Sequence, residues 1–170
     1  MSYESGNFTG KEWLDTVTLS PDLVILGQSI GVASSSFSFN RIGSGIDGVL
    51  GVGPTGFTRG TVNNTGTVPT VSDNLFSQGT ISEEVLGLYF IPAAETSKSG
   101  EITFGGYDES AILGPMNYVP LTTTSLSSSY WSFEQSISYG GTTILSEATG
   151  VVGSDTTLVL IATGECCDTG

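Results

Sequence analysis

The fold is decided by one short stretch of the chain, Asp47-Gly48-Val49-Leu50-Gly51-Val52-Gly53. Its apolar residues are separated by glycines at close intervals. Glycine at this density indicates that other backbone or a ligand approaches closely, because no side chain stands in the way. We therefore expect this stretch to lie against another segment of the chain or against a ligand.

The overall composition predicts an all-β protein. Charged residues make up 12 % of the 170 residues, against roughly 25 % in an average soluble domain, so Ser, Thr, Asn and Gly must form much of the surface. A composition rich in hydroxyl and β-branched residues, with 24 glycines, favours strands joined by tight turns. Long amphipathic helices are not predicted.

The charge balance and the absence of histidine exclude several functions. The 17 acidic and 4 basic residues give a formal net charge of −13. Binding to nucleic acid or to an anionic membrane surface depends on Lys and Arg, which are scarce here. Without histidine, neither a Ser-His-Asp or Cys-His catalyst nor a His-ligated zinc or haem can form. Acid–base chemistry must therefore come from carboxylates, Tyr, Cys or Lys.

The excess of carboxylates has two interpretations. When carboxylates protonate in an acidic medium, few positive charges remain to repel one another, which weakens the drive to acid denaturation. The same net charge also keeps a protein soluble at neutral pH. The composition leaves both interpretations open.

Apolar and β-branched runs between turn residues predict a series of strands. We expect strands at residues 16–19, 23–26, 29–33, 86–91, 101–104, 118–121, 131–137, 142–145 and 157–161. Polar segments between them predict a loop over residues 34–45, an irregular surface loop over 55–69 and a polar turn over 125–129.

One short helix is expected over residues 71–78. Thr70 can serve as its N-cap with Asp73 three residues later, Val71 and Leu75 would face inward, and Gly79 can adopt the left-handed conformation that ends a helix. A second helical turn is expected from residue 82, because Glu83 and Glu84 would lie near its positive end.

Several features concern processing and compartment. Cys166 and Cys167 are adjacent, so they form no metal site and a disulfide between them would be strained; we expect them to be incidental or to pair with residues outside this sequence. Asn7 and Asn63 begin N-glycosylation sequons. Residues 1–6 lack the basic and apolar regions of a signal peptide, and no apolar run is long enough to span a membrane.

A set of longer blocks carries the most specific information. They are Ser2-Tyr3-Glu4-Ser5-Gly6-Asn7-Phe8-Thr9-Gly10, the stretch 47–53, residues 74–81, residues 100–108, and Tyr118-Val119-Pro120-Leu121 followed by Tyr130-Trp131. In this order and spacing, they resemble the pepsin-like aspartic endopeptidases, and most of all the polyporopepsin-type group of fungal secreted proteases. The first block is similar to the flap hairpin of that family, and the second to its Asp-Gly-Ile-Leu-Gly-Leu-Gly signature.

The resemblance implies a bilobal β architecture, incomplete here, with one or two short helices. Residues 1–113 would be the remainder of the N-terminal lobe and residues 114–170 the beginning of the C-terminal lobe. Each lobe of the family gives one Asp-Thr/Ser-Gly loop to a central cleft. The family cleaves peptide or protein substrates at acid pH outside the cell, without metal or cofactor, and with two carboxyl groups that share one proton.

The chain departs from the family at both catalytic loops. The first Asp-Thr-Gly should precede the flap, and the chain begins at the flap. The second loop should read Val-Asp-Thr-Gly-Thr-Thr-Leu, but this chain has Gly153 in place of the aspartate, and the nearest acid is Asp155, two residues further on. The closing triplet, Asp168-Thr169-Gly170, follows no apolar strand and is not expected to be catalytic. We therefore expect a fragment that is inactive alone.

Several other residues of this chain match functional positions of the family. Tyr3 is similar to the flap tyrosine, Glu4 replaces the usual glycine beside it, and Ser5 and Gly6 match flap backbone positions. Three positions match substrate-binding residues of the family: Ile46, Val49 and Thr156.

Two alternative functions remain open. The first is a non-catalytic secreted β module that binds peptide or cell-wall polymer through the remaining cleft. The second is a homodimer in which two Asp155 loops face each other. The resemblance also implies that the strands that brace each catalytic loop lack their partners, so we expect unpaired strand edges and a tendency to self-associate.

Overall fold

The computed structural model describes residues 2–3, 6–37, 48–62, 66–92, 94–95, 99–125, 127–154 and 160–161. The chain divides into two compact units, Met1–Pro115 and Met116–Gly170. Regular structure in the described part consists of strands, one α-helix and three short 3₁₀ helices, so the predicted all-β class is confirmed. That these two units are the two lobes of the family stays a prediction. None of the helices described is long and apolar enough to cross a membrane.

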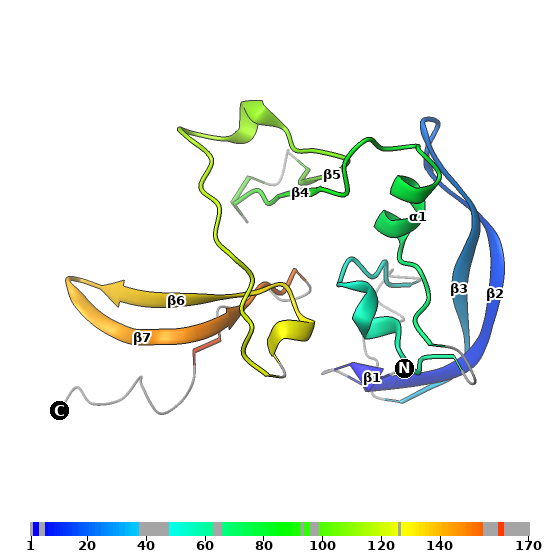
Figure 1. The fold of residues 1–170 in the computed structure, drawn as a ribbon, viewed down its shortest axis with the longest axis horizontal. Helices are drawn as coiled ribbons and strands as arrows, with labels where there is room; N and C mark the ends of the chain where they lie inside the picture. The colour runs from blue at the N-terminus through cyan, green and yellow to red at the C-terminus, as the bar shows by residue number, and fades with distance from the viewer. Residues whose placement is uncertain are drawn as a thin grey trace. The chain divides into compact units, whose positions relative to one another are not determined.

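A three-stranded antiparallel sheet dominates the first unit, in the order β1-β2-β3 (Figure 1). It consists of β1 (Ser2–Tyr3), β2 (Gly6–Ser20) and β3 (Leu23–Phe37). The two strands expected at 23–26 and 29–33 are therefore one. The loop expected over residues 34–45 was wrong for residues 34–37, because their backbone continues the ladder as far as the pair Asn7–Phe37; residues 38–45 lie outside the described part.

The helix α1 (Val71–Ser77) begins where the sequence predicts and ends one residue before the predicted end at Gln78. Its capping box is complete, because Thr70 Oγ1 accepts from the amide of Asp73 at 3.3 Å and Asp73 Oδ2 accepts from the amide of Thr70 at 2.7 Å. Gly79, with φ 72°, provides the left-handed residue that follows the helix. The predicted helix is thus confirmed, with its termini fixed by local hydrogen bonds.

The core of the first unit forms where α1 packs against β3 (Figure 1). Ile25, Val71, Leu75 and Ile81 are buried together, and partly buried Val17, Leu23 and Phe104 surround them. Polar groups also tie the two elements, because Asn74 Nδ2 donates to Gln28 Oε1 at 2.9 Å. A small apolar core, together with the hydrogen bond between Asn74 and Gln28, therefore holds the helix on the sheet.

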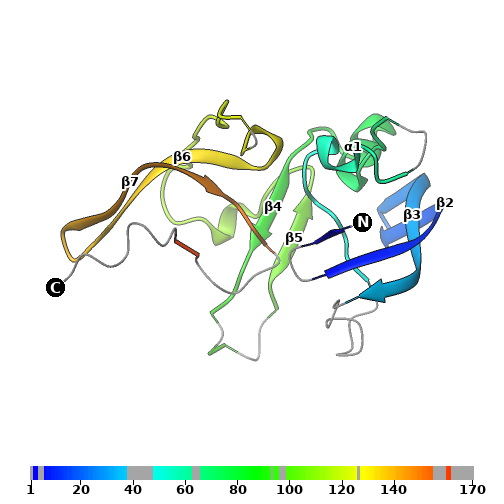
Figure 2. The ribbon, with the colours of Figure 1, turned by 90° about the horizontal axis from the view of Figure 1, so that it is seen from below.

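A second hairpin of the first unit pairs β4 (Leu86–Tyr89) with β5 (Glu101–Phe104) in antiparallel register, as Figure 2 shows. These strands were predicted, although β4 is shorter than expected. The helical turn expected from residue 82 was wrong. The amides of Thr80 and Ile81 both donate to the carbonyl of Leu75, and Ile81 enters the core. Residues 82–85 then lead to β4 through bends and irregular backbone, without a helical turn. A short 3₁₀ helix, η2 (Glu109–Ala111), follows β5.

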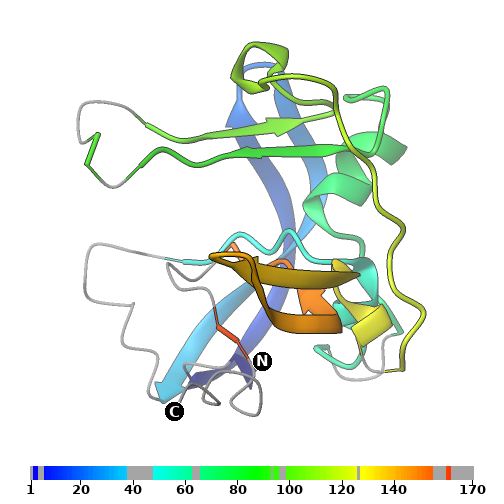
Figure 3. The same ribbon diagram turned by 90° about the vertical axis from the view of Figure 1, so that its left-hand side faces the viewer.

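The second unit is built on the hairpin of β6 (Ser132–Tyr139) and β7 (Thr142–Val151) (Figure 3). Gly140 and Gly141 both have positive φ and form its two-residue turn. A 3₁₀ helix, η3 (Ser127–Ser129), precedes it within the predicted polar turn. The strand predicted at 142–145 is longer than expected because pairing with β6 continues to Val151.

Two other strand predictions for the second unit were not met. Residues 118–121 form no strand, because none of the strands described lies beside them to form backbone hydrogen bonds. Just after this segment, the amide of Thr122 donates to the carbonyl of Ser132 at 2.8 Å. Of the strand predicted at 157–161, residues 157–159 lie outside the described part and residues 160–161 have no regular structure.

Candidate functional site

The hairpin of β1 and β2 brings two of the predicted flap residues opposite each other. Tyr3 pairs with Gly6, and Ser2 pairs with Asn7. The two residues that connect the strands, Glu4 and Ser5, lie outside the described part. On either side of this connection, β1 and β2 pair in antiparallel register. The assignment of these residues to a substrate-binding flap stays a prediction.

The predicted glycosylation site Asn7 lies in β2, between β1 and β3. Its backbone pairs with Ser2 on one side and with Phe37 on the other. Its side chain is exposed, so the glycan acceptor is accessible on one face of the sheet. The second sequon, at Asn63, lies outside the described residues.

The glycine-rich stretch 47–53 is largely exposed in the part that the structure describes. Residues 48–54 form no helix or strand, and the side chain of Val49 is 54 % exposed. A Cβ added at Gly48 or Gly51 would have no neighbour within 4 Å, whereas at Gly53 it would lie 3.2 Å from the ring of Phe57. No described segment of the protein therefore approaches Gly48 or Gly51, and the alternative that a ligand does so stays a prediction. Short-range packing explains the contact at Gly53, because Phe57 belongs to the next element, η1 (Thr55–Thr58). Ile46 lies outside the described part.

The segment that is predicted to carry the second catalytic triplet follows β7. The amide of Val152 donates to the carbonyl of Trp131 at 2.9 Å and so extends the hairpin by one residue beyond Val151. Gly153 and Ser154 follow and are exposed. β7 therefore runs up to the segment where the second catalytic triplet is expected, and the interpretation of Gly153 as the replacement of the family's aspartate stays a prediction. Asp155, Thr156, Cys166, Cys167 and the triplet 168–170 lie outside the described residues.

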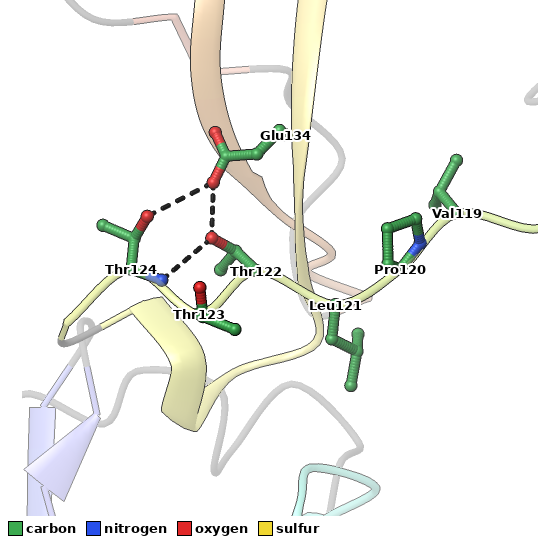
Figure 4. Close-up of a pocket in the computed structure, with 7 residues that line it drawn as sticks. All are labelled: Val119, Pro120, Leu121, Thr122, Thr123, Thr124 and Glu134. Atoms are coloured by element: carbon green, nitrogen blue, oxygen red, sulfur yellow. Dashed lines mark hydrogen bonds between the residues drawn. The ribbon is translucent and has the colours of Figure 1, made fainter.

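A cluster around Glu134 was not predicted from the sequence. Its carboxylate, on β6, accepts hydrogen bonds from the hydroxyls of Thr122 and, at 3.3 Å, of Thr124 (Figure 4). It also accepts from the hydroxyl of Thr149, on β7, at 3.0 and 3.1 Å. The hydrogen bond from Thr122, followed by that from Thr149, lowers the pKa of Glu134. Glu134 and residues 119–124 line a shallow hollow of about 460 Å³. This carboxylate therefore stays charged in mildly acidic solution.

No metal site emerges from the part of the chain that the structure describes. Nowhere in it do three or more Asp, Glu, Cys or His side chains gather closely enough to hold an ion.

The first unit carries the sheet of β1, β2 and β3 with α1 packed on β3, and the second unit is built on the hairpin of β6 and β7. The family model for eukaryotic aspartyl proteases matches residues 1–168. This chain belongs to the eukaryotic aspartyl protease family.

Two fungal proteases are among the relatives of this chain. The chain is 50 % identical to polyporopepsin of Irpex lacteus over 166 residues, which are 95 % of this chain and 47 % of that protein. It is 34 % identical to rhizopuspepsin-1 of Rhizopus niveus over 143 residues, covering 82 % of this chain and 33 % of the relative. The predicted polyporopepsin-type resemblance is confirmed.

A solved structure has the same fold. The crystal structure of the aspartic proteinase from Irpex lacteus superposes with a TM-score of 0.88 at 47 % identity, over 97 % of this chain and 48 % of that one. The predicted pepsin-like architecture is confirmed. The chain spans about half the length of the proteinases that it most resembles.

Proposed function

We propose that this chain serves peptide-bond hydrolysis at acid pH, outside the cell, by the two-aspartate mechanism of its family. The observation that carries the proposal is the match to the aspartyl protease family over residues 1–168. The substrates would be peptides or proteins, held beneath the hairpin of Tyr3 and Gly6. No metal or cofactor takes part in the proposed reaction.

The proposed chemistry needs two carboxyl groups that face each other. Two acids held close together cannot both ionise cheaply, so one keeps its proton and the pair titrates as a unit, as is known for this class of enzyme. The ionised member removes a proton from water as the water attacks the scissile carbonyl carbon. The protonated member donates to the carbonyl oxygen. A single displaced acid cannot do both.

We further infer that the 170-residue polypeptide is inactive by itself. Gly153 stands at the end of β7, where the family has its aspartate. Asp155 is two residues further along the chain, and a displacement of even 1 Å can cost about 100-fold in rate. The test is a protein-digestion assay at pH 3–5: activity that a pepstatin-like inhibitor blocks and Asp155→Asn abolishes would overturn this inference.

A pair of chimeras separates the family function from the altered loop. In the first, residues 2–152 replace the matching segment of Irpex lacteus polyporopepsin, which keeps both of its own catalytic triplets. We expect this chimera to digest protein at acid pH. In the second, residues 2–158 are transferred, which brings in Gly153 and Asp155, and we expect no digestion. An inactive but folded first chimera would contradict the proposed function.

A non-catalytic peptide- or polymer-binding module is the second candidate. It is favoured by the combination of a preserved hairpin at Tyr3 and Gly6 with glycine at position 153. Retention of the 170-residue chain on immobilised peptide or cell-wall polymer, without turnover, would support it. Loss of retention in Tyr3→Ala, with the fold intact, would assign the binding to the hairpin.

Self-association is proposed through free strand edges. β3 is an outer strand of its sheet, and β4–β5 and β6–β7 are two-stranded sheets in the described part of the chain. Such edges offer unpaired amides and carbonyls to another chain. Concentration-dependent elution on gel filtration tests the proposal, and a monomer at all concentrations would exclude it.

A further inference from the structure

The segment 119–124, which we call the leading segment, lies at the edge of β6 that faces away from β7. The carbonyl of Trp131 faces β7, because it accepts from the amide of Val152 there at 2.9 Å. Carbonyl groups alternate in direction along a strand, so the next carbonyl, that of Ser132, faces the other way. It accepts from the amide of Thr122 at 2.8 Å. The strand β6 therefore has β7 on one side and the leading segment on the other.

Glu134 spans these three segments with its side chain. Its partner across the hairpin is Thr149 of β7, whose hydroxyl donates to the carboxylate at 3.0 and 3.1 Å. From the other side of β6, the hydroxyls of Thr122 and Thr124 donate to the same carboxylate (Figure 4). One exposed acid thus joins the leading segment to the hairpin.

One oxygen of this carboxylate receives most of the hydrogen bonds. Oε1 accepts from all three threonine hydroxyls, and Oε2 accepts from Thr149. An ionised carboxylate has enough lone pairs for these donors, whereas a protonated carboxyl offers fewer acceptor sites and brings one more proton into the same space. Protonation of Glu134 must therefore remove at least one of its hydroxyl partners.

Thr122 transmits this loss to the backbone of the leading segment. Its hydroxyl donates to Glu134 and accepts from the amide of Thr124 at 3.1 Å. The residue is only 8 % exposed, so water cannot readily replace a lost partner, and a buried polar group without a partner is costly. The attachment of Thr122 and Thr124 to β6 therefore depends on the charge of Glu134.

No cation of the second unit competes with the hydroxyls, because residues 116–170 contain no Lys, Arg or His. The titratable residues described on the surrounding segments are Tyr118, Tyr130, Tyr139 and Glu147. Glu147 lines a neighbouring hollow together with Glu134, but no charged group is among the causes that shift the pKa of Glu134. Neutral hydroxyls alone therefore hold this charge.

We propose that Glu134 is an acid-released clasp between the leading segment and the β6–β7 hairpin. While Glu134 is ionised, the hydroxyls of Thr122 and Thr124 hold the leading segment against β6. When Glu134 takes up a proton from solvent, this attachment weakens and the leading segment separates locally. The hairpin stays paired, because its backbone register from Ser132–Val151 to Tyr139–Thr142 does not involve the carboxylate. The clasp does not rest on the proposed proteolytic function.

The pH at which the clasp opens follows from the sign of the pKa shift. The hydrogen bond from Thr122, followed by that from Thr149, holds the pKa of Glu134 below its ordinary value of 4.5. A lowered pKa means that the contribution of this group is complete above its unfolded-state pKa and is lost as the pH falls through its lower folded-state pKa. The clasp is therefore closed at neutral pH and in mild acid, and it opens only in stronger acid.

The direct test is amide hydrogen exchange, followed by NMR in the full 170-residue chain over a series of pH values. Protection factors correct for the intrinsic dependence of exchange on pH. We expect those of Thr122 and Thr124 to fall by about tenfold as the pH drops through the titration midpoint of Glu134, the loss that corresponds to one charge-assisted hydrogen bond. The internal control is the amide of Val152, in the hairpin, which should keep its protection.

Two outcomes of this series would overturn the clasp. Protection of Thr122 and Thr124 that does not change with pH would show that the leading segment does not depend on Glu134. An equal fall at Val152 would show that the whole unit opens and not the leading segment alone. The pH series of the unsubstituted chain decides between these outcomes without any variant.

A pair of variants assigns the pH step to one acid. Glu134→Gln cannot titrate and keeps a single acceptor oxygen, so we expect lower protection of Thr122 and Thr124 at neutral pH and no step in acid. The matched control is Glu147→Gln, which removes the other carboxylate of the hairpin and should preserve the step. A step that persists in Glu134→Gln, or that vanishes in Glu147→Gln, would contradict the proposal.

Salt separates the clasp from an ion pair. Because the partners of Glu134 are neutral hydroxyls, the step should remain in about 1 M salt, where the Debye length is roughly 3 Å and exposed ion pairs are screened. A step that disappears in salt would show that a cation holds Glu134, and it would overturn the assignment to the threonines.

Discussion

The side-chain amide of Gln78 pairs with the backbone of Leu26 in the manner of a neighbouring strand. The amide of Leu26 donates to Oε1 of Gln78 at 3.0 Å, and Nε2 of Gln78 donates to the carbonyl of Leu26 at 2.9 Å. Gln78 follows the last residue of α1 directly. One side chain therefore satisfies two backbone groups on β3 and fixes the C-terminal end of the helix on the sheet.

Replacement of Gln78 by alanine should remove both hydrogen bonds. Because each is partly exposed and worth roughly 0.5–1.5 kcal/mol net, we expect Gln78→Ala to lower the free energy of unfolding by about 1–2 kcal/mol. Urea unfolding measures this loss. Ser77→Ala, which removes one long hydrogen bond within the helix, should change the stability little, and an equal loss in the two variants would contradict the assignment.

The two faces of α1 should differ in their response to truncation. Leu75 is completely buried, whereas the adjacent Phe76 is 45 % exposed. We expect Leu75→Ala to cost about 2–5 kcal/mol, since it removes a buried side chain and leaves a cavity. Phe76→Ala should cost less although it removes more atoms. Thermal unfolding of the two variants side by side tests the orientation of the helix.

Two glycines with positive φ should respond differently to alanine. At Gly105, with φ 83°, an added Cβ would lie 2.8 Å from the Cβ of Ile81 in the core, whereas at Gly79, with φ 72°, it would meet nothing within 4 Å. We expect Gly79→Ala to cost about 1 kcal/mol from backbone strain alone. Gly105→Ala should cost about 2–3 kcal/mol, because strain and a clash add. Equal unfolding midpoints would show that the contact at Ile81 is not made.

The threonine hydroxyls around Glu134 should be visible in its titration. They hold the pKa of this carboxyl below its ordinary value of 4.5. The stability that Glu134 contributes is therefore present above its unfolded-state pKa and is lost as the pH falls through the lower folded-state pKa. We expect Thr122→Val to raise the NMR midpoint of Glu134.

The matched control for this titration is Thr143→Val. Thr143 lies on β7 like Thr149, but its hydroxyl contacts Ser138 and not the carboxylate. It should leave the midpoint of Glu134 where it is. A midpoint that responds to Thr143→Val as strongly as to Thr122→Val would indicate a general change in the hairpin.

Local signals account for what the sequence predicted well. The helix 71–77 follows from residues within one turn of its ends, since Thr70, Asp73 and Gly79 supply the cap, the capping box and the left-handed residue. The strand 101–104 is likewise a short segment. The strands 131–137 and 142–145 were also predicted, although the hairpin turn at Gly140 and Gly141 that joins them was not. Such elements are specified by their own residues, so they can be predicted without knowledge of the fold.

The predictions that were wrong or missing concern interactions between residues that are distant in the sequence. The segment 118–121 has the composition of a strand, but a strand needs a neighbour to pair with, which its own sequence cannot supply. The contact of Glu134 with Thr149 depends on the register of β6 against β7, which shifts between Gln135 and Ile137. No spacing in the sequence fixes such a shift.

The candidate site was predictable in part for the same reason. The pairing of Tyr3 with Gly6 follows from a two-residue connection, and the strand before Gly153 follows from its apolar run. The acids that would complete a catalytic pair belong to different loops. Their meeting depends on the assembly of whole lobes, which no single motif determines.

The contacts between β3 and the helix α1 join residues that are far apart in the sequence. During synthesis on the ribosome, these contacts therefore form after the β2–β3 hairpin has been made. Leu26 and Gln78 are 52 positions apart, and Gln28 and Asn74 are 46 apart. The long hairpin of β2 and β3 is thus synthesised well before the helix that shields Ile25. During that interval its apolar side is open to chaperones and to other nascent chains, and closure of so large a loop makes helix docking a late step in folding.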